Sequence, residues 1–257
     1  MYQVIAIPAF SDNYLWAIVN KEGYCAIVDP GDASPVIDFL QTHNYTLTDI
    51  LLTHHHPDHI GGVDTLLKTY NNINVYGPST ERFPMVNKPC KENDQITLPQ
   101  LNIALTVMEV PGHTIDHICY FDQLSLFVGD TLFSAGCGRL FEGSPEQMHQ
   151  SLTRISALDK HTIVYCAHEY TLANLKFALT VNAENQDLIA YNNSATQLRS
   201  ENIATIPTVL STQLDINPFL RSFDPAIKQA VIKHFNLKDS ITDVECFTYL
   251  RKWKDKF

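Results

Sequence analysis

A chain of 257 residues, of which 45% are hydrophobic and 18% charged, is long enough to bury a core of its own and lacks the bias of a disordered tail or a fibre. Its formal net charge of −10 disfavours nucleic acid as a partner, because a negative field repels a polyanion. The longest clear apolar stretch near the N-terminus, residues 14–19, falls far short of the roughly 20 residues of a membrane-spanning helix. The first residues also lack the basic charge of a secretory signal, so we expect a cytoplasmic protein without a membrane partner. We also expect it to be a monomer.

Strands are predicted in the first two thirds of the chain, where short apolar runs are bounded by turn residues. The runs are residues 4–7, 15–19, 26–28, 50–52, 73–76, 103–110, 118–121, 126–128 and 163–165. A helix is predicted over residues 35–42, with Ser34 as its cap and Pro35 at its first position. Another is predicted over residues 144–158, where Ser144 and Gln147 have the spacing of a capping box.

The character of the chain changes after about His168. Apolar strand runs end there, and helical periodicity continues from Leu172 to the C-terminus. We therefore predict a catalytic domain over residues 1–168 and a helical domain over residues 169–257. The six cysteines are scattered, without a CxxC pair or the dense spacing of a disulfide scaffold, so we expect them to be reduced.

A histidine-rich segment, Thr53-His54-His55-His56-Pro57-Asp58-His59, directly follows the apolar run 50–52. Alternate side chains share one side of an extended backbone, so His54 and His56 are expected to face one metal ion while His55 points elsewhere.

Pro57 then turns the chain. Asp58 and His59 stand where a helix through residues 60–67 would begin, and there they would supply a second pair of ligands. The two glycines at 61–62 allow the backbone to pack close to this site.

A histidine taken alone is more often a satisfied core or surface residue than a ligand, and a poly-histidine tract is another simple explanation. Neither explains an aspartate inside the cluster at a strand-to-helix junction. Three further ligand-type residues, His113, Asp130 and His168, also stand just after apolar runs. Strand ends meet at one edge of a sheet, the usual place for a site in layered α/β folds, so the pattern predicts a metal site.

The order of these motifs resembles that of the metallo-β-lactamase superfamily: THHHPDH is followed by Pro-Gly-His at 111–113, Gly-Asp-Thr at 129–131 and Ala-His-Glu-Tyr at 167–170. Five segments resemble the glyoxalase II, or hydroxyacylglutathione hydrolase, family within it. They are FSDNY at 10–14, GDTLF at 129–133, CGR at 137–139, HEYT at 168–171 and NPFLR at 217–221. The resemblance spans nearly the whole chain.

The resemblance implies an α/β fold, an αββα metallo-β-lactamase-type sandwich followed by a smaller all-helical C-terminal domain. It also implies a binuclear centre in which Asp130 bridges two ions. One ion would be held by His54, His56 and His113, and the other by Asp58, His59 and His168. Imidazole and carboxylate ligands suit zinc, which we expect, while iron or manganese also occupy such mixed sites.

The implied activity is hydrolysis of S-(2-hydroxyacyl)glutathione thioesters, notably S-D-lactoylglutathione to D-lactate and glutathione, by a hydroxide that bridges the two ions. Two cations about 3.5–4 Å apart lower the pKa of a shared water and polarise a carbonyl. Within this resemblance, Asp58 and Asp130 are the expected catalytic residues. No protein nucleophile is needed, and no Ser-His-Asp pattern has supporting context. A thiolate, whose thiol has a pKa of roughly 8.5, leaves without obligatory protonation.

An anionic substrate approaching an acidic protein needs local cations. The glyoxalase II pattern implies glutathione contacts at Arg251 and Lys254, with Arg139 and Tyr170 nearer the metals. Taken alone, a basic last helical turn would equally well complement the helix dipole. Arg139 replaces the lysine of many members and keeps the charge, whereas Phe141 replaces a tyrosine and removes a hydroxyl that would bind the tripeptide.

Three alternatives remain at this point. A persulfide dioxygenase of the same superfamily uses a single iron and would not need the complete second ligand set or the helical domain. A non-catalytic metal-binding or regulatory module would not need intact Asp58 and Asp130. A nuclease-type relative is disfavoured by the charge and by the absence of a long basic run.

Overall fold

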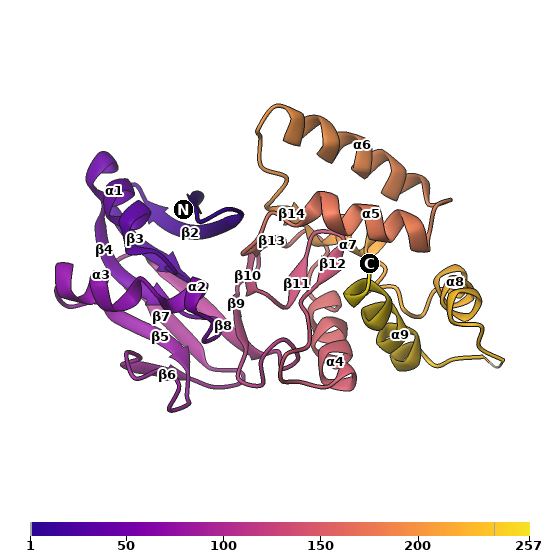
Figure 1. Cartoon of the computed structure of the whole chain (residues 1–257). Coiled ribbons are helices and arrows are strands. Elements are labelled where there is room, and N and C mark those ends of the chain that lie inside the picture. The colour runs from indigo at the N-terminus through magenta and orange to yellow at the C-terminus, as the bar shows by residue number, and fades with distance from the viewer. Residues whose placement is uncertain (1, 239) are drawn as a thin grey trace. The chain divides into compact units, whose positions relative to one another are not determined.

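The computed structural model describes residues 2–238 and 240–257. They form two compact units (Figure 1). The first unit comprises the chain up to Glu109 together with Asp116–Gly129, and the second comprises Val110–Ile115 and Asp130–Phe257. The chain therefore crosses between the units at three points. The boundary after residue 168 follows a change in composition and stays a prediction.

The first sheet belongs to the first unit and has the strand order β1-β2-β3-β4-β5-β6. Its strands are β1 (Tyr2–Ala9), β2 (Asn13–Asn20), β3 (Tyr24–Val28), β4 (Thr46–Leu51), β5 (Asn74–Pro78) and β6 (Lys88–Cys90). Pairing is antiparallel from β1 to β3 and parallel from β3 to β6. The parallel part brings the carboxyl ends of β3 and β4 to one edge, where Asp29 and the histidine-rich segment follow.

Helices α1 (Ala33–His43) and α3 (Val63–Thr69) lie against this sheet (Figure 1). Val36 and Leu40 of α1 and Leu66 of α3 are buried with Ile27 and Ile50 of the strands in one hydrophobic core. This core fixes the sheet edge from which the metal motif extends.

The start of α1 differs from the prediction. Asp32, not Ser34, is the N-cap, because its side chain accepts a hydrogen bond from the Ser34 amide at 2.9 Å. Pro35 is still accommodated, since amides in the first turn have no partner within the helix.

The helix predicted over residues 60–67 is divided into α2 (Pro57–Ile60) and α3. The glycines between the two helices meet neighbouring backbone, as predicted: a Cβ on Gly62 would lie 2.5 Å from the amide nitrogen of Ala33. Gly31 makes a similar approach, since its Cβ would lie 1.8 Å from the carbonyl oxygen of Asp58. The metal motif therefore packs directly on the loop after β3.

Four antiparallel strands of a second sheet complete the first unit, in the order β7-β8-β9-β10. They are β7 (Gln95–Leu98), β8 (Ile103–Glu109), β9 (Ile118–Phe121) and β10 (Ser125–Gly129). Several hydrogen bonds join this sheet to the first. Among them, the Tyr120 hydroxyl donates to the Leu52 carbonyl at 2.8 Å, and the Tyr76 hydroxyl donates to the Thr97 carbonyl at 3.0 Å.

The second unit is mainly helical, with two pairs of short strands. Its strands are β11 (Leu132–Phe133), β12 (Gly136–Cys137), β13 (Ile163–Cys166) and β14 (Thr208–Val209), and its helices are α4 (Pro145–Ser156), α5 (Thr171–Val181), α6 (Gln186–Ser200), α7 (Leu210–Ile216), α8 (Pro225–Phe235) and α9 (Asp243–Asp255). The capping box of Ser144 and Gln147 is confirmed at α4. The prediction that strands end at His168 was wrong, because β14 lies beyond this residue and pairs with β13.

All six cysteines are buried and free, as predicted. Among the described residues, every helix is too short or too polar to cross a membrane.

Candidate metal centre

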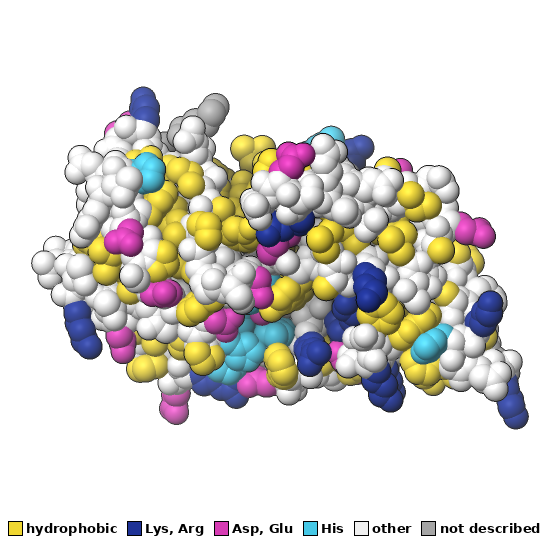
Figure 2. Space-filling model, turned by 45° about the horizontal axis from the view of Figure 1, so that its top comes forward, with side chains coloured by type: hydrophobic (Ala, Val, Ile, Leu, Met, Phe, Trp, Pro, Cys, Tyr) yellow, Lys and Arg dark blue, Asp and Glu magenta, His cyan; other side chains and the backbone are white. Residues whose placement is uncertain are grey.

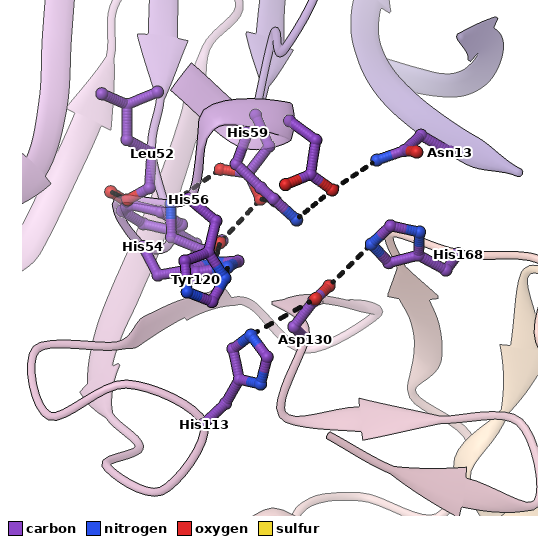
Figure 3. Close-up of polar contacts among 12 residues, drawn as sticks. Asn13, Leu52, His54, His56, His59, His113, Tyr120, Asp130 and His168 are labelled. Atoms are coloured by element: carbon purple, nitrogen blue, oxygen red, sulfur yellow. Dashed lines mark hydrogen bonds and ion pairs between the residues drawn. The ribbon is translucent and has the colours of Figure 1, made fainter. Parts of the chain in front are cut away.

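In the first unit, His54 and His56 face each other after the end of β4. The Nε2 atom of His54 lies 3.0 Å from the Nδ1 atom of His56 (Figure 3). His55 points elsewhere, with its Nδ1 atom 3.4 Å from the Oδ1 atom of Asp116. This is the alternation expected of an extended segment.

Asp58 and His59 lie on the short helix α2. The Nε2 atom of His59 is 3.6 Å from Oδ2 of Asp58, and the Asn13 side-chain amide donates to the same oxygen at 3.0 Å. His59 is buried, whereas the Asp58 side chain is 39% exposed. A buried imidazole and a partly accessible carboxylate therefore stand together, within reach of solvent.

Asp29 contacts His59 directly and His54 through Thr53. The sequence had not identified Asp29 as a site residue. Its Oδ2 atom lies 2.9 Å from Nδ1 of His59. Thr53 donates to the same carboxylate twice, from its hydroxyl to Oδ2 at 2.6 Å and from its amide to Oδ1 at 2.8 Å. Asp29 is buried and has a φ of 50°, an uncommon angle for a residue with a side chain. Its position directly after the apolar run 26–28 is the signal that would have identified it.

These contacts fix which ring nitrogen carries the proton in neutral His54 and His59. A carboxylate only accepts, so Nδ1 of His59 is protonated. The Thr53 hydroxyl gives its single proton to Asp29 and therefore accepts from Nδ1 of His54, which lies 3.1 Å away. In its neutral form each of these two rings therefore has an unprotonated Nε2, the form that binds a metal.

In the second unit, Asp130 stands between two histidines. Its Oδ2 atom lies 3.5 Å from Nε2 of His113, and its Oδ1 atom lies 3.4 Å from Nε2 of His168 (Figure 3). All three side chains are buried. Nδ1 of His113 lies 2.8 Å from the Arg139 carbonyl, which only accepts, so His113 also presents Nε2 toward Asp130.

The donor set in each unit suits a divalent metal ion. Ligands 2.0–2.1 Å from a tetrahedral zinc ion are roughly 3.3 Å apart. The separations within the units run from 3.0 to 3.6 Å, and several are too long for hydrogen bonds. Imidazole nitrogens and carboxylate oxygens bind zinc, iron and manganese alike. The residues present therefore fit such an ion.

Two of the three predicted substrate cations, Arg139 and Arg251, lie beside Asp255 at the end of α9. Arg251 is buried, donates to Asp255 Oδ1 from Nε at 3.1 Å and to the Cys137 carbonyl at 2.9 Å, and covers the ring of Phe219. Arg139 is exposed, with its Nε atom 3.9 Å from Asp255. Arg251 is thus held in place by protein groups, while Arg139 extends into solvent.

Lys254 is half-buried and donates to the Ala173 carbonyl at 2.9 Å. Burial first, and then the positive charge of Arg251, lowers the pKa of Lys254 to about 8. Tyr170 stacks on His168, with ring centroids 4.6 Å apart. Phe141 is 63% exposed and meets His113 edge-on, so its ring lies beside a predicted ligand.

Charge is divided unequally between the units. The first contains five Lys and Arg against 14 Asp and Glu, a formal charge of −9, and the second contains 13 against 14, a formal charge of −1. On the face drawn in Figure 2, charged side chains are interspersed with hydrophobic ones. An anionic ligand is therefore repelled least by the second unit, which also carries the cations around Asp255.

Comparison with known sequences gives full-length matches. Residues 12–168 match the metallo-beta-lactamase superfamily, and residues 169–257 match the family described as hydroxyacylglutathione hydrolase C-terminus. Proteins called hydroxyacylglutathione hydrolase from Vibrio parahaemolyticus, Aliivibrio fischeri and Photobacterium profundum are 47%, 48% and 48% identical to this chain, over 100% of this chain and of each relative.

Solved structures agree on the fold. The crystal structure of BLEG-1 B3 metallo-beta-lactamase has a TM-score of 0.64 and 24% identity over 86% of this chain and 99% of that chain. ETHE1 from Myxococcus xanthus has a TM-score of 0.58 and 24% identity over 82% and 94%. The predicted architecture, a metallo-β-lactamase fold followed by a helical C-terminal domain, is thereby confirmed.

Proposed function

The chain belongs to the hydroxyacylglutathione hydrolase family of the metallo-β-lactamase superfamily, and from this premise we propose that it hydrolyses S-(2-hydroxyacyl)glutathione, notably S-D-lactoylglutathione, at a binuclear metal centre. It is accordingly a thioester hydrolase that binds divalent metal ions. The persulfide dioxygenase and the non-catalytic module lose support, because relatives matching the full chain carry the hydrolase name.

The proposal of two ions rests above all on Asp130. Each of its carboxylate oxygens faces a different imidazole, which suits a carboxylate shared by two ions. We assign the first ion to His54, His56 and His113, the second to Asp58, His59 and His168, and Asp130 to both. Zinc is the metal we propose, with iron or manganese able to take its place.

When bound, such an ion pair acidifies a water and polarises the thioester carbonyl. The protein's own groups prepare this chemistry. Asp29 and Thr53 hold the Nδ1 protons of His54 and His59, so a neutral ring has the tautomer whose Nε2 is unprotonated. The Asn13 side-chain amide donates a hydrogen bond to Oδ2 of Asp58. This contact orients the carboxylate, and we propose that Asp58 accepts a proton from the attacking water. The leaving thiolate needs no acid, because a thiol pKa near roughly 8.5 allows it to depart as an anion.

Substrate binding is proposed for residues 169–257 together with Arg139. Glutathione carries more carboxylate than ammonium charge, and we propose that the positive charges of Arg139, Arg251 and Lys254 offset it. Lys254 and the exposed Arg139 are the proposed carboxylate partners. Arg251, which the resemblance also gave as a glutathione contact, is buried and bonded to the Cys137 carbonyl, so we propose that it supports the site. Tyr170, stacked on His168, is proposed to contact the substrate beside the metals.

The same proposal includes the compartment and the assembly state. Six free, buried cysteines suit the reducing cytoplasm, where disulfides are rare. We propose that the chain acts there as a monomer.

Release of thiol tests the proposed activity. Purified protein reconstituted with zinc should cleave S-D-lactoylglutathione faster than a small lactoyl thioester that lacks the peptide, and a chelator should abolish both reactions. Equal rates on the two substrates would contradict glutathione selection, and a rate unaffected by chelator would contradict metal dependence.

A further inference from the structure

A small buried hairpin occupies the second unit just after Asp130. Strands β11 and β12 pair Leu132 with Cys137 and Phe133 with Gly136. The turn residues between them, Ser134 and Ala135, are 1% and 0% exposed. Ala135 has a φ of 56°, in the left-handed region, so surrounding structure must hold this turn.

Side-chain amides from the helices supply that support. Gln213 of α7 accepts a hydrogen bond from the Ala135 amide at 2.7 Å. Asn217, which ends α7, donates to the carbonyls of Phe133 and Gly136 at 3.2 and 2.9 Å.

Asn174 of α5 donates to the Ser134 carbonyl at 3.0 Å. Gln213 and Asn217 are both fully buried. Because buried peptide groups require partners, these three amides complete the hydrogen bonding of a turn that water does not reach. Ala135 also packs in the hydrophobic cluster of α5 and α7, with Leu175 and Ile216.

The two ends of the hairpin lead to the metal ligands of the same unit. Asp130 stands two residues before β11, and Arg139, whose carbonyl fixes the proton of His113, stands two residues after β12. The ends are closely fitted, since the Gly138 amide donates to the Thr131 carbonyl at 3.3 Å and a Cβ on Gly138 would lie 2.1 Å from the Asp130 carbonyl oxygen. A shift of the hairpin therefore moves Asp130 and the partner of His113 together.

We infer that Asn174, Gln213 and Asn217 are positioning residues for the metal centre. They hold the hairpin, and the hairpin holds Asp130 and the Arg139 carbonyl in the places from which they act on the ligand set. Under this inference, which rests on the proposed function, the helical region determines metal affinity in addition to binding substrate. The buried asparagine of the NPFLR segment thus serves the ligands of the catalytic centre.

Zinc affinity in Asn217→Asp tests this inference. The substitution keeps the size of the side chain and the oxygen that accepts from the Phe219 amide, but it replaces the donor of two hydrogen bonds by a carboxylate that faces two carbonyls. Affinity is measured on the full chain by competition with a chromogenic zinc chelator, well below the melting temperature. We expect it to fall about tenfold or more, the lower end of the range for loss of an outer-shell partner.

Val231→Ala is the matched control, because Val231 is a fully buried core residue of α8 outside the hairpin cluster. It should lower the melting temperature without changing zinc affinity. Unchanged affinity in Asn217→Asp would overturn the inference, and so would an equal loss in the control.

Asn174→Ala removes one hydrogen bond to the hairpin and replaces Asn217→Asp in the test if that variant does not fold. A fall in zinc affinity smaller than tenfold supports the inference, and an unchanged zinc affinity contradicts it. Failure of the wild type to bind zinc would instead refute the proposed function.

Discussion

The Nδ1 atom of His59 lies 2.9 Å from the Oδ2 atom of Asp29, a carboxylate that also accepts two hydrogen bonds from Thr53. Through Thr53 the same carboxylate reaches His54. One aspartate that is not a proposed ligand therefore sets the tautomer of two ligands that we assign to different ions.

Asp29→Asn is expected to weaken metal binding about 10–100-fold, the usual cost of losing an outer-shell partner. An amide has one oxygen and cannot accept from His59 and from both groups of Thr53. Chelator competition measures the affinity. Asp32→Asn, a change at the cap of α1 where asparagine also serves, is the control and should bind metal normally. Normal affinity in Asp29→Asn would refute the positioning role.

Asp130→Ala should lower the occupancy of both metal sites and abolish turnover, because each carboxylate oxygen faces a different histidine. His55→Ala should have little effect, since His55 faces Asp116. Metal content and thiol release are measured on both variants. Comparable losses in the two would show that the assignment of facing side chains is wrong.

The KM for lactoylglutathione is expected to rise as the pH increases through about 8, the pKa of Lys254. Below that pH the ammonium is charged and attracts a carboxylate, and above it the charge is lost. Bound substrate raises the apparent pKa of Lys254, because a nearby carboxylate stabilises the charged ammonium. Lys254→Met should remove this pH dependence while Lys252→Met, on the same helix, retains it. A wild-type KM that stays constant across this pH range would exclude the role of Lys254.

Arg251→Met should destabilise the protein by about 1.5–3 kcal/mol, the range for hydrogen bonds to a charged group. Arg251 is buried and bonded to the Cys137 carbonyl and to Asp255, so its removal leaves these groups without their donor. Urea unfolding measures the change, and Lys254→Met should lose much less stability. If Arg251→Met instead raised KM at unchanged stability, a direct contact with substrate would be indicated.

The ligand set could be proposed from sequence because its members stand directly after apolar strand runs. Asp29 obeys the same rule after β3 but lies outside any histidine-rich motif, so only its contacts with His59 and Thr53 identify it. The burial of Arg251 also had a signal: Phe247, Leu250 and Arg251 follow helical spacing on one face of α9.

No sequence pattern predicted the short strands. Two-residue strands such as β11, β12 and β14 are set by partners distant in sequence or by a turn, and they leave no periodicity. The hairpin that carries the further inference depends on Gln213 and Asn217, more than 70 residues away from it in the chain. Contacts of this kind require the folded structure.

Titration of metal into the metal-free enzyme tests the central claim most directly, with bound metal and thiol release from S-D-lactoylglutathione measured on the same samples. Seven ligand side chains exceed the three protein ligands that a single catalytic zinc usually takes. The account predicts that activity reaches its maximum at about two equivalents per chain, as a two-metal site requires. Full activity with one tightly bound ion per chain would contradict it.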